Sequence, residues 1–99
     1  MGLDFAIEEL HATGWNNFDS SGCAHHADGR AYPRVERVRR ELESLGLTLS
    51  LTHVQLFECY RAEWSDGRGV PKGAVVGRSE EEAAVFALAR ARRHALVVA

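Results

Sequence analysis

The feature that most constrains the fold is a change in hydrophobic period at Gly46. After this glycine, apolar residues alternate with polar ones over 47–51, which is the period of a strand with one buried face. Before it, apolar residues recur at the three- and four-residue spacing of a helix. The helical stripe consists of Val35, Val38, Leu42 and Leu45. Because Gly46 also suits the left-handed residue that closes a helix, a helix leads directly into a strand here, as in α+β domains.

The remaining stretches complete a predicted α+β fold. Near the N-terminus an apolar stripe precedes Gly14, and Phe5 falls off that stripe and needs another partner. Further on, Ser79 and Glu82 form a capping box that opens a helix, and Pro33 suits the first turn of another. We expect helices over 3–13, 33–45 and 80–93 to pack on a small antiparallel sheet with strands over 47–51, 54–64, 72–77 and, as an option at the chain end, 95–98.

The range 53–64 allows two interpretations. As a strand it buries Leu56, but the inward parity then changes, which requires a bulge near Thr52 and His53. As a helix it would place its apolar residues on one face behind a capping box. We favour the strand, because β-branched and aromatic residues are frequent and a turn-forming segment follows at 65–69.

Residues 15–32 are dense in Asn, Asp, Ser and Gly and show no sustained period. We expect a long loop or a small hairpin, because Asp28 and Gly29 form a good type I′ turn pair. Long loops inside compact domains are often functional, so this segment is the first place to look for a site.

Length and composition predict one domain over 1–99. The chain is 45% hydrophobic and 26% charged, as in ordinary globular proteins, so it should fold alone or with a copy of itself. Its start lacks the apolar region of an export signal, and no apolar run approaches the roughly 20 residues that cross a bilayer. We therefore expect a cytoplasmic protein with reduced thiols and no membrane role. The net charge of −2 includes no strong basic field, which makes nucleic acid an unfavoured partner.

Cys23, His25 and His26 occupy three of four consecutive positions in the 15–32 segment. Thiolate and imidazole ligands together suit zinc, so these residues form a candidate metal site. Possible sources of a fourth ligand are His11, His53 and Cys59. No C-x-x-C pair accompanies them, and we favour a buried Cys23 that anchors the loop beside two solvated histidines. Zinc binding stays as an alternative, and no other cofactor is expected.

A cysteine nucleophile is a further option, with Cys23 or Cys59 activated by His25 or His53. Such a pair needs hydrogen-bond reach and a third, orienting group, and no spacing in the sequence enforces either. Cys59 lies in an apolar run and is better explained as an inert core residue. The sequence therefore favours a non-enzymatic role.

Four aromatic residues could stack nucleic-acid bases beside Arg61, namely Trp15, Phe57, Tyr60 and Trp64. We favour a core role for them, because a domain of this size needs most of its aromatic side chains inside. Three arginines of the second helix offer a second route to RNA binding, which a solvated face with glutamate partners explains equally well: Arg34, Arg37 and Arg40.

Residues 33–93 resemble double-stranded RNA-binding domains in their order of helix, three strands and capped Ala-rich helix. The most similar segment is 73–79, followed by Ala83, Ala84 and Ala87. The resemblance implies an α-β-β-β-α layout. That family carries lysines in the first turn of its last helix to hold phosphates, whereas this chain has three glutamates at 80–82, which would repel RNA.

The function that the sequence favours is a protein-interaction or assembly module, with a homodimer as the expected form. RNA binding and zinc binding are the alternatives. The apolar segment 95–99 would be a poor solvated terminus, so the contact is expected at an edge strand or at Leu96, Val97 and Val98.

Overall fold

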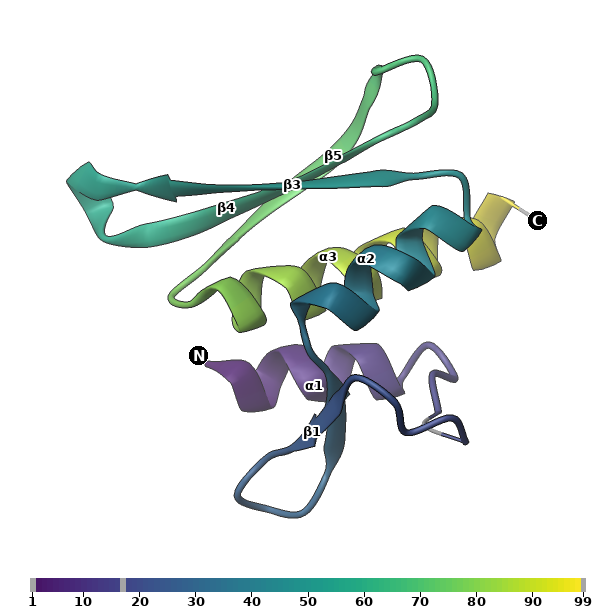
Figure 1. Ribbon diagram of the computed structural model, residues 1–99, viewed down its shortest axis with the longest axis vertical. Coiled ribbons are helices and arrows are strands. Elements are labelled where there is room, and N and C mark those ends of the chain that lie inside the picture. The colour runs from purple at the N-terminus through teal and green to yellow at the C-terminus, as the bar shows by residue number, and fades with distance from the viewer. Residues whose placement is uncertain (1, 17, 99) are drawn as a thin grey trace.

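The computed structural model describes residues 2–16 and 18–98, with the side chains of Leu96, Val97 and Val98 outside the description. Figure 1 shows three layers: a twisted sheet, a middle layer of two helices, and a third layer with the N-terminal helix and a small hairpin. In chain order the elements are α1 (Leu3–His11), β1 (Cys23–His25), β2 (Ala31–Pro33), α2 (Val35–Ser44), β3 (Thr48–Val54), the 3-10 turn η1 (Gln55–Phe57), β4 (Cys59–Ser65), β5 (Pro71–Gly77) and α3 (Glu80–Val98). The predicted α+β class is confirmed.

Helix α3 is the centre of the molecule. All residues over 83–89 are buried, and this run is continuously apolar. A helix that is apolar on every side must be covered on every side, and α3 indeed lies between the sheet and α1 (Figure 1). The predicted stripe of Ala84, Ala87 and Leu88 is buried, but Val85 and Phe86 on other sides of the helix are buried as well.

The larger sheet is an antiparallel meander in the order β3-β4-β5. Its inner face contributes Leu49, Ala62 and Trp64 to the core. The opposite face is open to solvent, as in the row that pairs Thr52 with Arg61 and Val76. β3 and β5 are the edge strands, and the sheet therefore has two candidate edges for pairing with another chain.

The range 53–64 contains strand, as favoured, but it is split between two strands. β3 ends at Val54, η1 reverses the chain, and β4 begins at Cys59. The helix interpretation is wrong apart from this single 3-10 turn. No bulge is needed near Thr52, because the turn itself resets which residues face inward, and the register shift of this sheet lies between Trp64 and Ser65.

Two predicted boundaries are wrong. The last helix does not stop at residue 93 but continues to Val98, so the optional strand over 95–98 is not formed. The physical reason is that neither glycine nor proline occurs between Ser79 and Val98 to end the helix. Pro33 lies in β2 rather than in a helix, and α2 begins at Val35.

From Cys23 on, the segment 15–32 forms the small hairpin that was one of its two expected forms, whereas 18–22 contain bends and turns. β1 and β2 pair antiparallel, with His25 opposite Ala31. Asp28 and Gly29 lie in the connecting turn, where Gly29 has a φ of 92°. Asp28 does not have the positive φ that a type I′ turn requires, so that predicted turn type is wrong, and residues 26–30 connect the two strands. Among the residues described, no helix combines the length and the apolar character needed to cross a bilayer.

Candidate functional site

A groove of about 450 Å³ opens between β5, α3 and the start of α1. Its apolar lining comes from all three elements: Phe5 of α1, Val75 and Val76 of β5, and Phe86 of α3. Arg78 and Arg90 add positive charge to the lining, and Cys59 and Glu82 also belong to it. We call this concavity the β5–α3 groove.

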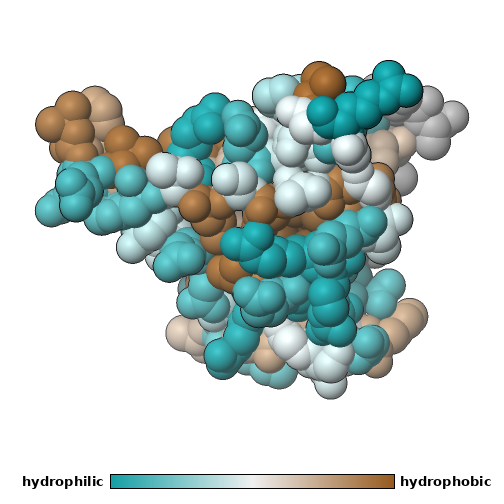
Figure 2. Space-filling view, turned by 45° about the horizontal axis from the view of Figure 1, so that its top comes forward, coloured by the Kyte–Doolittle hydropathy of each residue, from teal (hydrophilic) through white to brown (hydrophobic). Residues whose placement is uncertain are grey.

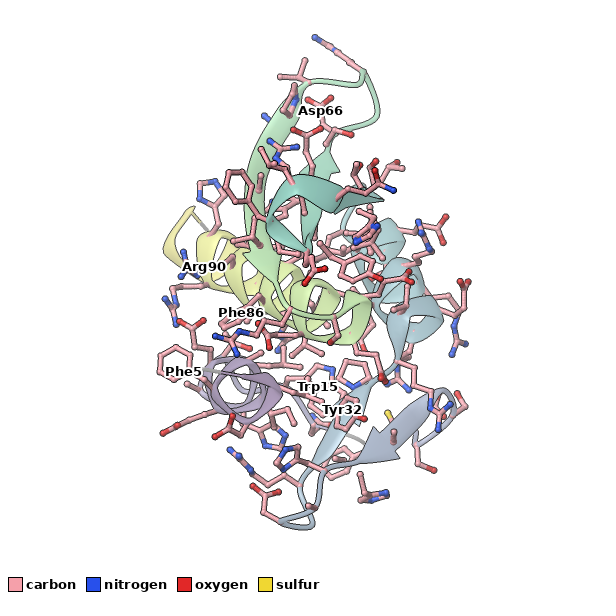
Figure 3. The ribbon with its side chains drawn as sticks, turned by 90° about the vertical axis from the view of Figure 1, so that its left-hand side faces the viewer. Phe5, Trp15, Tyr32, Asp66, Phe86 and Arg90 are labelled. Atoms are coloured by element: carbon pink, nitrogen blue, oxygen red, sulfur yellow. The ribbon has the colours of Figure 1, made fainter. Side chains whose placement is uncertain are left out.

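An aromatic pair forms the part of the groove nearest α1. The rings of Phe5 and Phe86 are 6.1 Å apart at 48°, so Phe86 is the partner that the sequence left open for Phe5. Phe86 is 9% exposed and Phe5 is 41% exposed. Figure 3 shows Phe5, Phe86 and Arg90 on the same side of the molecule. The groove therefore presents a partly uncovered aromatic surface to solvent.

The predicted capping box stands beside this groove. The Glu82 backbone N–H donates to the Ser79 hydroxyl at 3.1 Å, and the Glu82 carboxylate accepts from the Arg78 N–H at 3.1 Å. The box thus reaches one residue further back than the usual pattern. The Glu82 carboxylate is engaged in starting α3, which leaves little of it for contact with a ligand.

The two basic side chains of the groove differ in their surroundings. The Arg90 guanidinium lies 3.8 Å from the Glu9 carboxylate of α1. The Arg78 side chain is exposed, and within the described part of the chain no carboxylate is in ion-pair distance of it. Arg78 is therefore free to pair with an acidic group of a partner.

The turn between β3 and β4 forms an apolar projection next to the groove. Leu56 is 85% exposed and Phe57 is 73% exposed. Glu58 ends the turn in a left-handed conformation (φ 47°), and its N–H donates to the Gln55 carbonyl at 3.2 Å. We call residues 55–58 the hairpin tip. Figure 2 shows apolar residues at the end of the projecting arm.

The exposure of the tip corrects the sequence interpretation, which placed Leu56 and Phe57 in the core. Trp15 and Trp64 are core residues as favoured, at 5% and 6% exposure, and Tyr60 is half-buried. Phe57 differs from them because it lies in a reversing turn beyond the end of the sheet, where no helix covers it. A turn at this position could not be read from residue types alone.

The candidate zinc ligands lie away from the groove, in the two-stranded hairpin β1–β2. Cys23 is half-buried, His25 is exposed, and His26 begins the turn with its Nδ1 3.4 Å from an oxygen of Asp28. Across the described residues no three His, Cys, Asp or Glu side chains are arranged to hold a metal ion. His53 and Cys59, named as further ligands, belong to the other sheet.

Arg37 explains why Cys23 is held in place. Its guanidinium donates to the carbonyl oxygens of Asp19 and Ser21 and lies 3.7 Å from the Cys23 sulfur. It also pairs with Glu41 at 2.7 Å. The predicted glutamate partner is thus present, but the side chain is only 11% exposed and is not part of a solvated face. Burial raises the pKa of the Cys23 thiol above its ordinary value of 9.0, although Arg37 acts in the opposite direction.

The structure does not join His53 to Cys59 as a nucleophile pair. The His53 ring stacks on Tyr60, with centroids 4.8 Å apart. Cys59 precedes Tyr60 on β4, so its side chain points to the opposite face of the sheet. On that outer face Arg61 pairs with Glu63 at 3.1 Å, which reduces the positive charge available to a phosphate backbone.

Comparison of this chain with protein families, with curated proteins and with solved structures finds no significant match. The resemblance to double-stranded RNA-binding domains is therefore limited to the order of elements, which is α2, β3, β4, β5 and α3. The sequence also predicted a contact at Leu96, Val97 and Val98, whose side chains lie outside the structural description.

Proposed function

We propose that this chain is an assembly module that forms a homodimer through the hairpin tip and the β5–α3 groove. The exposure of Leu56 and Phe57 is the observation that carries the proposal. Large apolar side chains at the end of a projecting turn lose little contact with water on folding, so folding alone gives little reason for them. A partner that covers them would supply that reason.

The position of the groove, next to the hairpin tip, supports the proposal that both belong to one interaction surface. Cys59 follows the hairpin tip directly and also lines the groove, so the convex and the concave apolar regions adjoin. A volume of about 450 Å³ is in the range of pockets that enclose a small ligand, which is enough space for side chains of a second protein.

The zinc and RNA alternatives have weaker support. Zinc requires the thiolate of Cys23, whereas burial favours its protonated form. RNA binding through the start of α3 would bring phosphates against Glu80, Glu81 and Glu82. The proposed interaction surface does not include Cys23, Glu80 or Glu81, and the carboxylate of Glu82, which lines the groove, is bonded at the start of α3.

Sedimentation velocity over a wide range of concentrations tests the proposal. We expect a concentration-dependent dimer for the unaltered chain. Replacing Phe57 with serine should weaken association by about 2 kcal/mol, a roughly thirty-fold rise in Kd, because a buried aromatic anchor is lost.

Val70→Ser is the matched control. Val70 is 49% exposed and lies at the end of the other hairpin turn, between β4 and β5. Loss of an exposed apolar side chain there, a smaller one than phenylalanine, should leave the dimer intact. A chain that sediments as a monomer at every concentration would contradict the proposed function, as would equal effects of the two substitutions.

A further inference from the structure

We infer that the two copies exchange their hairpin tips, with Leu56 and Phe57 of each copy inserted into the β5–α3 groove of the other. This arrangement rests on the proposed function and specifies its geometry. The hairpin tip of each copy packs into the β5–α3 groove of the other. A two-fold axis relates the two identical contacts.

The first argument is continuity between the two surfaces. Phe57 lies two residues before Cys59, so their Cα atoms are at most about 7 Å apart. The tip nevertheless does not fill its own groove, because Phe57 is 73% exposed. Adjacent surfaces of opposite shape are what an isologous dimer needs, since a two-fold axis between them brings each onto its counterpart and closes the assembly.

The second argument is charge complementarity. Glu58 follows the two apolar residues of the tip, and among the described residues no basic side chain forms an ion pair with it. The groove carries Arg78 and Arg90, and its one carboxylate, that of Glu82, accepts from the Arg78 backbone N–H. Within the described residues the Arg78 guanidinium itself forms no ion pair. An inserted tip therefore carries its carboxylate towards a guanidinium that is free to receive it.

The third argument concerns the competing arrangement, in which two β5 edges pair with each other. An antiparallel pairing centred on Val75 places Lys72 directly opposite Arg78 of the other copy. Like charges opposite each other across a strand pair are destabilising. The charges therefore disfavour this register of the β5 edge, in which Arg78 follows the last strand residue, Gly77.

Charge reversal in two separate variants tests the exchange. In E58R the tip repels the groove of an identical copy, and in R78E the groove repels the tip. Each variant alone should raise the Kd of its homodimer roughly ten-fold, because each dimer contains two altered contacts of modest strength.

A mixture of E58R and R78E should restore association. In the mixed dimer one contact joins the new arginine to the new glutamate, and the other is the original pair of Glu58 and Arg78. Sedimentation of the mixture should show a dimer at concentrations where each variant alone is monomeric, and thermal melting of each variant verifies that it is folded.

The outcomes separate the two proposals. A dimer that is lost in Phe57→Ser but is unaffected by both charge reversals, or that is not restored on mixing, overturns the exchange and retains the proposed function. A dimer lost in Ala74→Lys and retained in E58R assigns the contact to the β5 edge and overturns both the exchange and the proposed tip-and-groove contact. A wild-type monomer at all concentrations overturns both and leaves the groove to a partner of another sequence.

Discussion

Gly77 lies where the backbone of β5 approaches the first turn of α3. A Cβ atom at this residue would be 2.7 Å from the Ala83 nitrogen and 3.0 Å from the Ala83 Cα, which are backbone atoms that cannot move aside cheaply. We expect Gly77→Ala to lower the free energy of unfolding by about 1 to 3 kcal/mol, the usual cost of overpacking. Urea denaturation in the Phe57→Ser background, at protein concentrations below the Kd of that variant, measures this effect without a contribution from association.

Gly67→Ala is the control for that substitution. A Cβ at Gly67 meets no atom within 4 Å, so alanine there should be neutral or slightly stabilising, because it restricts the unfolded chain. Equal losses of stability at the two glycines would show that the approach of β5 to α3 is not what requires Gly77.

Residue-level contacts could be predicted from the sequence where they are local. The contact between Ser79 and Glu82 spans three residues, and a helix start brings them together whatever the rest of the chain does. Arg37 was misjudged because its acceptors at Asp19 and Ser21 are 18 and 16 residues away. Only the folding of the β1–β2 hairpin onto α2 puts those carbonyl oxygens within its reach.

At the scale of elements, Asp66 stabilises the turn that joins β4 to β5. One oxygen of its carboxylate accepts hydrogen bonds from the N–H groups of Arg68 and Val70, at 2.8 and 3.0 Å. These two hydrogen bonds lower the pKa of Asp66 below its ordinary value of 3.8, and the bond from Val70 has the larger effect. Its ionised form therefore stabilises the fold above pH 3.8, and this contribution is lost as the pH falls through the lowered value.

Two substitutions separate the charge of Asp66 from its geometry. Asn keeps an oxygen that can accept both N–H bonds but cannot titrate, so Asp66→Asn should reduce the acid dependence of stability and retain most of the stability at neutral pH. Asp66→Ala should lose both. Urea midpoints measured from neutral pH into acid give the comparison, and an unchanged pH profile in both variants would contradict this role.

Elements with clear end signals were predicted well, and those without them were not. The helix closed by Gly46 was expected over 33–45 and extends over Val35–Ser44. The tail was misjudged because apolar character at 95–98 suggested a strand, while the absence of any helix breaker lets α3 continue. The hairpin tip was missed for a related reason, since no glycine or proline marks the turn over 55–58.

At the scale of the molecule, α3 determines the layered arrangement. Its alanines present a small surface that the sheet can approach from one side and α1 from the other. Polar contacts add to the second interface: Arg92 donates to the Thr13 hydroxyl at 2.8 Å, and Arg93 lies 3.4 Å from Glu9. The sequence predicts that α3 is buried. Which element covers its second side depends on contacts between distant parts of the chain, such as the one between Thr13 and Arg92, which are 79 residues apart.

The end of α3 provides a test of where two copies of the whole molecule meet. If the dimer forms through the tips and grooves, removing residues 96–99 should leave association unchanged. Because a dimer that dissociates on unfolding is stabilised by mass action, its melting temperature should rise with protein concentration in both the full chain and the truncated chain. Phe57→Ser should shift that rise to roughly thirty-fold higher protein concentrations in either length, since it weakens the contact itself. A truncated chain whose melting temperature no longer depends on concentration would instead place the contact at Leu96, Val97 and Val98.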